Sequence, residues 1–171
     1  MLSRKMTEAI NQQINAELYS AYLYLSMQAY FDSVGLPGSA NWMRVQAMEE
    51  FTHADRLYKY MTERGAKVTM MPIKGPDTEW DSPLAVFEAV CAHEQKVTGL
   101  INNLIDLATE ERDHATVNAL QWFVSEQVEE ESSANAVVQK LSLMGDAKGG
   151  LFMIDRELGA RVFTPPAASA E

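Results

Sequence analysis

The chain has 171 residues, 47% of them hydrophobic, and its 14 Lys and Arg stand against 24 Asp and Glu, for a formal net charge of −10. These values predict one acidic globular domain and exclude nucleic acid as a partner, because such a surface repels a phosphate backbone. The single cysteine, Cys91, excludes an internal disulfide and a cysteine-rich metal centre, so we expect a cytoplasmic, reducing setting. No apolar run approaches the roughly 20 residues of a membrane span, so we expect no membrane segment.

Glycine and proline gather in a few places, and the segments between them have helical character. We expect helices at about 4–33, 39–64, 83–110 and 113–144, and a shorter one at about 147–158. Gly65 and Gly145 stand where left-handed helix caps are common. Ser82, Pro83 and Asp113 fit helix starts. The fold class is therefore all-α, with residues 1–160 forming one domain and 161–171 a flexible C-terminal tail.

The segment 66–81 is expected to be a long connector, since it contains prolines and a glycine and has no sustained period. Its extended length, roughly 53 to 58 Å, exceeds the about 39 Å of the preceding helix. It can therefore cross the full length of a bundle and leave the second and third helices parallel. The other two long connections are short and predict antiparallel helix pairs.

Each long helix has an apolar seam with alternating spacings of three and four residues, and each seam contains an acid near its middle. In the third helix Glu94 interrupts an otherwise apolar series of Phe87, Val90, Val97, Ile101, Leu104 and Ala108. The corresponding acids of the other seams are Glu17, Glu50 and Glu130.

These four acids have similar depths in the predicted bundle. Glu50 and Glu94 lie equally far from the starts of two parallel helices, at residues 39 and 83. In the antiparallel third and fourth helices, Glu94 and Glu130 match within one residue, or about 1.5 Å. Glu17 matches less tightly, within one or two turns. We therefore expect four carboxylates to converge on one layer of the core.

Several buried carboxylates repel one another and favour protonation unless a cation neutralises them. A bound metal resolves this conflict. Glu50 and His53 are three residues apart on one helix face, so an imidazole can join the oxygen ligands. This donor set suits Fe or Mn, and Zn less distinctively, and the number of acids indicates two ions.

With these residues the chain resembles the ferritins, and among them the bacterial non-haem ferritins, over about residues 4–158. The resemblance implies a ferritin-like four-helix bundle with a long crossover between the second and third helices and a short fifth helix. It also implies iron storage with ferroxidase activity, in which Fe(II) is oxidised at a di-iron centre by O2 or peroxide. The ferric mineral would be held in a hollow shell of 24 identical subunits.

The resemblance assigns metal ligands residue by residue. It implies a first iron site from Glu17, Glu50 and His53, and a second from Glu50, Glu94 and Glu130. Glu50 would bridge the two ions.

The same resemblance assigns further roles around these two sites. Tyr24 matches a tyrosine that hydrogen-bonds the site, and Gln127 matches a polar side chain just outside the ligands. Glu49, Glu126 and Glu129 match a third, weaker iron site.

One departure from a related family bears on cofactors. Haem-binding bacterioferritins have a second Glu-x-x-His on the fourth helix and a methionine after the bridging glutamate. Here the corresponding residues are Gln127, Glu130 and Phe51, so we expect no haem.

Two alternative functions remain open. One is a di-metal oxidase or peroxide-detoxifying protein without significant storage. The other is a non-catalytic helical scaffold whose core acids are merely paired.

Outside the site, we expect His93 and His114 at the surface.

Overall fold

The computed structural model describes residues 1–145 and 148–165, and these residues form five α-helices and no strand. The helices are α1 (Arg4–Ser33), α2 (Pro37–Glu63), α3 (Pro83–Glu110), α4 (His114–Met144) and α5 (Lys148–Leu158). The all-α prediction is confirmed, and the predicted bounds agree within two residues. Residues 166–171 of the predicted tail lie outside the described residues.

The helix ends have the capping groups that the sequence predicts. The Ser82 hydroxyl accepts from the Ala85 N–H at 3.1 Å, and the Asp113 carboxylate accepts from the Thr116 N–H at 3.2 Å. Each side chain satisfies an N–H that has no partner within its helix. Gly65 has a φ of +69°, a conformation that favours glycine after a helix.

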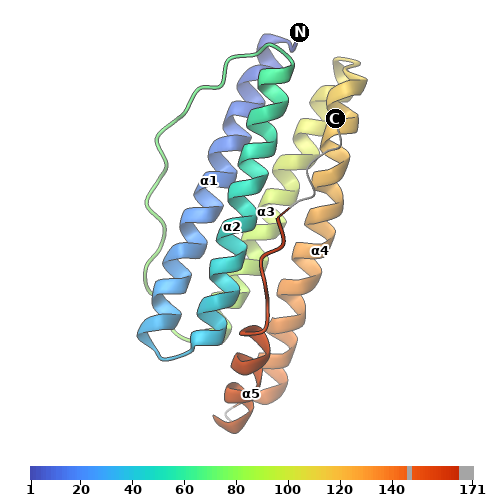
Figure 1. Ribbon diagram of the computed structural model, residues 1–171. Helices are drawn as coiled ribbons and strands as arrows, with labels where there is room; N and C mark the ends of the chain where they lie inside the picture. The colour runs from blue at the N-terminus through green and yellow to red at the C-terminus, as the bar shows by residue number, and fades with distance from the viewer. Residues whose placement is uncertain (146–147, 166–171) are drawn as a thin grey trace.

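The crossover between α2 and α3 runs along the side of the bundle (Figure 1). Side chains of α1 hold its backbone. Asn11 accepts from the Thr69 N–H at 2.7 Å, and the Ser26 hydroxyl donates to the Asp77 carbonyl at 2.7 Å. Because the chain returns to the opposite end of the bundle, α2 and α3 are parallel, as predicted.

The apolar core consists of two blocks separated by a polar layer. One block includes Phe31, Met43, Phe87 and Val137, and the other includes Ile10, Met61, Ile101 and Leu120. Along all four long helices, the predicted ligands lie between the segments that form these blocks. The acids are therefore fixed by packed side chains on both sides.

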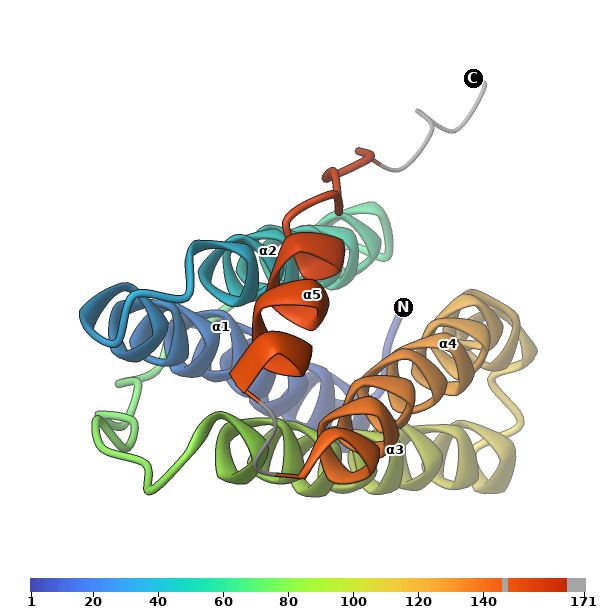
Figure 2. The ribbon, with the colours of Figure 1, turned by 90° about the horizontal axis from the view of Figure 1, so that it is seen from below.

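Helix α5 crosses one end of the bundle and contacts α2 and α4 (Figure 2). Its Asp155, only 8% exposed, accepts from the backbone N–H groups of Gly38 and Ser39 at 3.0 and 2.7 Å and from the Ser39 hydroxyl at 2.8 Å. This carboxylate satisfies the first turn of α2, which explains why α2 begins at Pro37 and not at the predicted residue 39. The helices approach so closely that a Cβ on Gly38 would lie 1.7 Å from the Asp155 carbonyl oxygen.

Among the described residues, no helix combines the length and the apolar character that crossing a bilayer requires.

Candidate metal centre

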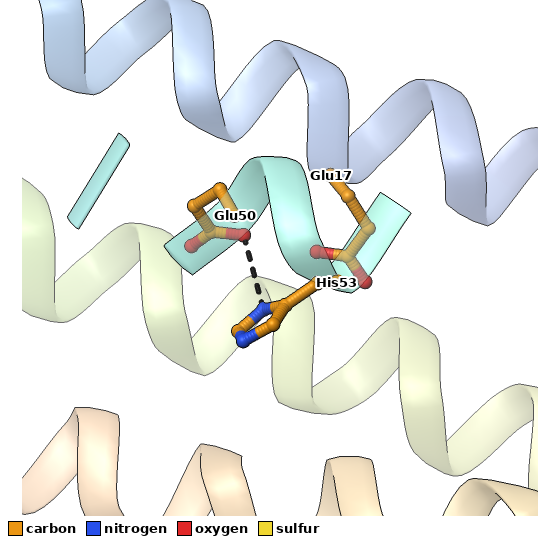
Figure 3. Close-up of side chains that lie close together, drawn as sticks. All are labelled: Glu17, Glu50 and His53. Atoms are coloured by element: carbon orange, nitrogen blue, oxygen red, sulfur yellow. Dashed lines mark ion pairs between the residues drawn. The ribbon is translucent and has the colours of Figure 1, made fainter. Parts of the chain in front are cut away.

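The five residues predicted to bind the first two irons are all buried in the polar layer. Glu94 is 0% exposed, Glu17 and Glu50 are each 1%, His53 is 3% and Glu130 is 7%. Glu17 extends from α1 toward Glu50 and His53, which both come from α2 (Figure 3). Glu94 and Glu130 come from α3 and α4. All four long helices thus contribute one carboxylate.

Two groups of three residues bring possible ligand atoms within 4.8 Å of one another in the described part of the chain. The first is Glu17, Glu50 and His53, and the second is Glu50, Glu94 and Glu130. These are the same two triads that the resemblance implies. Glu50 belongs to both, so its two oxygens can each face a different ion.

Four carboxylate oxygens in this layer are buried without a hydrogen-bond partner. They are Glu17 Oε2, both oxygens of Glu50, and Glu130 Oε2, and no other buried side-chain polar atom of the described residues shares this condition. A buried acceptor without a partner is costly. These oxygens are therefore suited to coordinate a metal ion.

Burial is the largest cause that shifts the pKa values of these acids. It raises the pKa of Glu17 to about 7, against the lowering effect of a hydrogen bond from Gln13. Burial, followed by the charges of Glu130, Glu94 and Glu17, raises the pKa of Glu50 well above its usual range. Burial and then the charge of Glu94 do the same for the pKa of Glu130. Without a cation, the layer holds protons at neutral pH.

His53 is neutral in this environment. Burial, with a smaller effect of the Arg56 charge, lowers the pKa of His53 to about 4. Its Nδ1 lies 3.4 Å from Glu50 Oε2 (Figure 3), and its ring packs edge-on against Trp122 with centroids 5.3 Å apart. A neutral imidazole keeps a lone pair free for a metal.

Tyr24 and Gln127 both contact Glu94, one of the predicted ligands. The Tyr24 hydroxyl donates to Glu94 Oε1. The Gln127 amide donates to Glu94 Oε2 and to the Thr98 hydroxyl, each at 3.3 Å. Burial is also the largest cause that raises the pKa of Tyr24 well above 10, so the phenol keeps its proton and acts as a donor.

Two buried glutamines that the sequence analysis did not single out also contact predicted ligands. Gln13 donates to Glu17 Oε1 at 2.9 Å, and Gln46 donates to Glu130 Oε1 at 3.1 Å. Each lies four residues before a seam acid on its own helix, Glu17 or Glu50. A polar residue one turn from a buried acid is a signal that could have indicated them.

The prediction that His93 lies at the surface is wrong. His93 is half-buried, its Nε2 is 2.7 Å from the Ser20 hydroxyl, and its ring meets Tyr24 edge-on with centroids 6.1 Å apart. Next to Glu94 on α3, it turns toward α1, because the aromatic side chains there cover its ring.

Glu49, Glu126 and Glu129 form a looser cluster on α2 and α4. Burial, and then the charges of Glu126 and Glu129, raise the pKa of Glu49, whereas Arg161 lowers it. These three acids are not among the groups whose ligand atoms lie within 4.8 Å of one another. In this structure Glu49 is instead paired with Arg161 at 2.5 Å.

Residues 7–144 match the family model described as a ferritin-like domain. A bacterial non-heme ferritin of Bacteroides fragilis is 45% identical over 94% of this chain and 100% of its own length. A bacterial non-heme ferritin of Staphylococcus aureus is 38% identical over 95% of this chain and 98% of its own length.

A solved structure with the same fold comes from the archaeon Archaeoglobus fulgidus and is described as a novel open pore ferritin. It has a TM-score of 0.94 and 54% identity, over 95% of this chain and 100% of that chain. The residues matched by the family model, 7–144, include all of α2, α3 and α4, α1 from residue 7 onward, and every predicted ligand. The chain belongs to the ferritin family.

Proposed function

We propose that this protein stores iron, oxidising Fe(II) at the buried centre and keeping the ferric product as a mineral inside a hollow shell of 24 copies. The observation that carries this proposal is the set of four unpartnered carboxylate oxygens beside a neutral imidazole. Relatives named bacterial non-heme ferritin support the storage function, and the ferritin fold supports the shell. The acidic composition and the single cysteine support a cytoplasmic location.

In this proposal the ligand triads hold one iron each. Glu17, Glu50 and His53 bind the first ion, Glu50, Glu94 and Glu130 bind the second, and Glu50 bridges them. Each Fe²⁺ loses one electron, and the two electrons, with two protons from solvent, reduce one O2 to hydrogen peroxide or one hydrogen peroxide to two waters. The carboxylates favour this step because their negative charge stabilises Fe³⁺ more than Fe²⁺.

The neighbouring side chains have supporting roles. Tyr24 and Gln127 orient Glu94 by hydrogen bonds, which fixes the direction of its oxygens before iron arrives. Glu49, Glu126 and Glu129 offer a third, weaker position for iron between the centre and the mineral. We expect this position to fill only after the first two.

The test is an anaerobic titration of the purified apo-protein with Fe²⁺, followed by oxygen, with ferric absorbance measured against iron added per chain. We expect a fast phase that saturates at two irons per chain, or three if the third position takes part, and then slower mineral growth. If oxidation follows the protein-free control at every ratio, the proposal is wrong and the core acids serve a structural scaffold.

A further inference from the structure

The chain after α5 folds back onto α2 (Figure 1). The Asn41 side-chain amide donates to the Arg161 carbonyl at 2.9 Å and is 3.4 Å from the Gly159 carbonyl. These two bonds use only backbone oxygens of the segment, so they can persist when the Arg161 side chain is replaced. Contacts with the bundle thus continue to Arg161, at the start of the predicted tail.

The Arg161 guanidinium is held on one face of α2 by three residues. It stacks on the Trp42 ring at 4.5 Å from the centroid, Nη1 donates to Gln46 Oε1 at 2.6 Å, and Nη2 donates to Glu49 Oε2 at 2.5 Å. The side chains of Arg161 and Glu49 are only 24% and 27% exposed. With one aromatic and two polar contacts, the planar guanidinium of Arg161 is held in one position and orientation.

This cation contacts the proposed third site directly and is linked to the second iron site through Gln46. It pairs directly with Glu49. It also fixes the Gln46 amide, because a guanidinium only donates and therefore selects the Gln46 oxygen. The Gln46 nitrogen is then left to donate to Glu130 Oε1 at 3.1 Å.

We propose that Arg161 is an internal counter-cation that competes with iron for Glu49, so that the third iron binds only by displacing the guanidinium. The inference rests on the proposed function, because it concerns the third iron position. Competition from Arg161 would lower the affinity of the third position for iron relative to the other two. Among the described residues, no lysine or arginine is ion-paired with a carboxylate of the two buried triads, and four of those carboxylate oxygens have no hydrogen-bond partner.

The test is anaerobic isothermal titration of the assembled apo-protein with Fe²⁺. In Arg161→Gln, we expect the third binding event to tighten about tenfold, a modest value because the pair is partly solvent-exposed. The first event, at Glu17, Glu50 and His53, should keep its affinity. Arg161→Lys should tighten the third event less, by about threefold, because an ammonium cannot hold Gln46, Glu49 and Trp42 together.

A matched control and a double variant separate this competition from general charge effects. Arg156→Gln removes a positive charge from the exposed side of α5 and should leave all three events unchanged. In the Glu49→Gln background, Arg161→Gln should have no further effect, since the competing carboxylate is gone.

Each outcome decides one of the two proposals. An unchanged third event in Arg161→Gln overturns the inference, and so does equal tightening in Arg156→Gln. If Arg161→Gln does not assemble, an unchanged third event in Arg161→Lys overturns it instead. If wild-type protein lacks the two tight events, the proposed function itself has failed.

Discussion

The side chain of Glu94 provides the sharpest test of the metal centre at the scale of single residues. Glu94→Gln removes one ligand charge but keeps groups that can bond Tyr24 and Gln127. We expect the fast two-iron oxidation to slow by at least about a hundredfold, because loss of a side chain that only orients a ligand already costs about 10- to 100-fold. The free energy of unfolding of the apo-protein should not fall, because burial opposes the charge of Glu94 in the folded state.

The matched control is Glu88→Gln, which removes an exposed acid from the same helix and should leave oxidation unchanged. Stopped-flow ferric absorbance measures the rate, and size-exclusion chromatography checks assembly. A Glu94→Gln variant that is disassembled but fully active would contradict the assignment.

A second prediction concerns pH, because the buried acids must lose protons before they bind iron. The folded pKa of Glu17, about 7, lies above its ordinary 4.5, so the stability it contributes to the apo-protein is present below pH 4.5 and is lost as pH rises through 7. His53 has the opposite effect on stability. Its folded pKa of about 4 lies below its ordinary 6.5, so the stability it contributes is present above pH 6.5 and is lost as pH falls toward 4.

Above pH 6.5 the contribution of His53 to stability no longer changes with pH. The change in stability there comes from Glu17 and the other acids whose pKa values are raised. The Tm of the apo-protein should therefore fall between pH 6.5 and 8, while the Tm gain from anaerobic Fe²⁺ grows. Differential scanning calorimetry at both pH values, with and without Fe²⁺, measures this. A Tm gain that does not grow between pH 6.5 and 8 would show that binding displaces no protons.

The buried acids of the polar layer were predictable from the sequence, whereas the residues that orient or neutralise them were only partly so. Glu17, Glu50, Glu94 and Glu130 interrupt apolar seams at matching depths, which spacing along a helix reveals. Arg161 is 115 residues from Gln46, and no periodicity connects them. Such a contact depends on where α5 ends and how the chain turns back, which local sequence does not determine.

At the scale of elements, α5 stabilises α2 through a buried carboxylate. Asp155→Ala would leave the Gly38 and Ser39 N–H groups unpartnered beneath α5. We expect a loss of about 1–2 kcal/mol of unfolding free energy, as for loss of a helix N-cap. The midpoint of urea unfolding of the apo-protein measures it.

The control on the same helix is Glu157→Ala, whose partner Lys140 lies at the surface. This exposed pair should contribute well below 1 kcal/mol. Equal losses of unfolding free energy in the two variants would mean that the buried bonds of Asp155 stabilise the protein no more than an exposed ion pair does.

The same carboxylate shows why one helix boundary differed from its prediction. Ser82 and Asp113 cap α3 and α4 from adjacent sequence, and both starts were predicted within one residue. The cap of α2 comes from Asp155, 116 residues after Ser39. Boundaries set by local side chains can be read from sequence, and boundaries set by tertiary contacts cannot.

At the scale of the whole molecule, the long crossover makes the centre possible. It leaves α2 and α3 parallel, which brings Glu50 and Glu94 to the same depth, and the short turns then bring Glu17 and Glu130 to that layer. The length of the segment 66–81 was enough to predict this arrangement. The bundle alone, however, supports oxidation without storage equally well.

Mineral retention decides between these two functions, because one chain offers ligands for only a few ions. We expect purified protein loaded aerobically with excess Fe²⁺ and passed through a desalting column to retain far more iron than its ligand sites can hold. Iron and protein assays on the shell fraction measure the iron retained per chain. Glu94→Gln protein, loaded for the same time as the wild type and before slow oxidation is complete, should retain less iron. Retention limited to two or three irons per chain, with fast oxidation intact, would instead identify a di-metal oxidase. The difference is physical: a mineral needs an enclosed acidic volume shared by many subunits, whereas oxidation needs only the four helices of one.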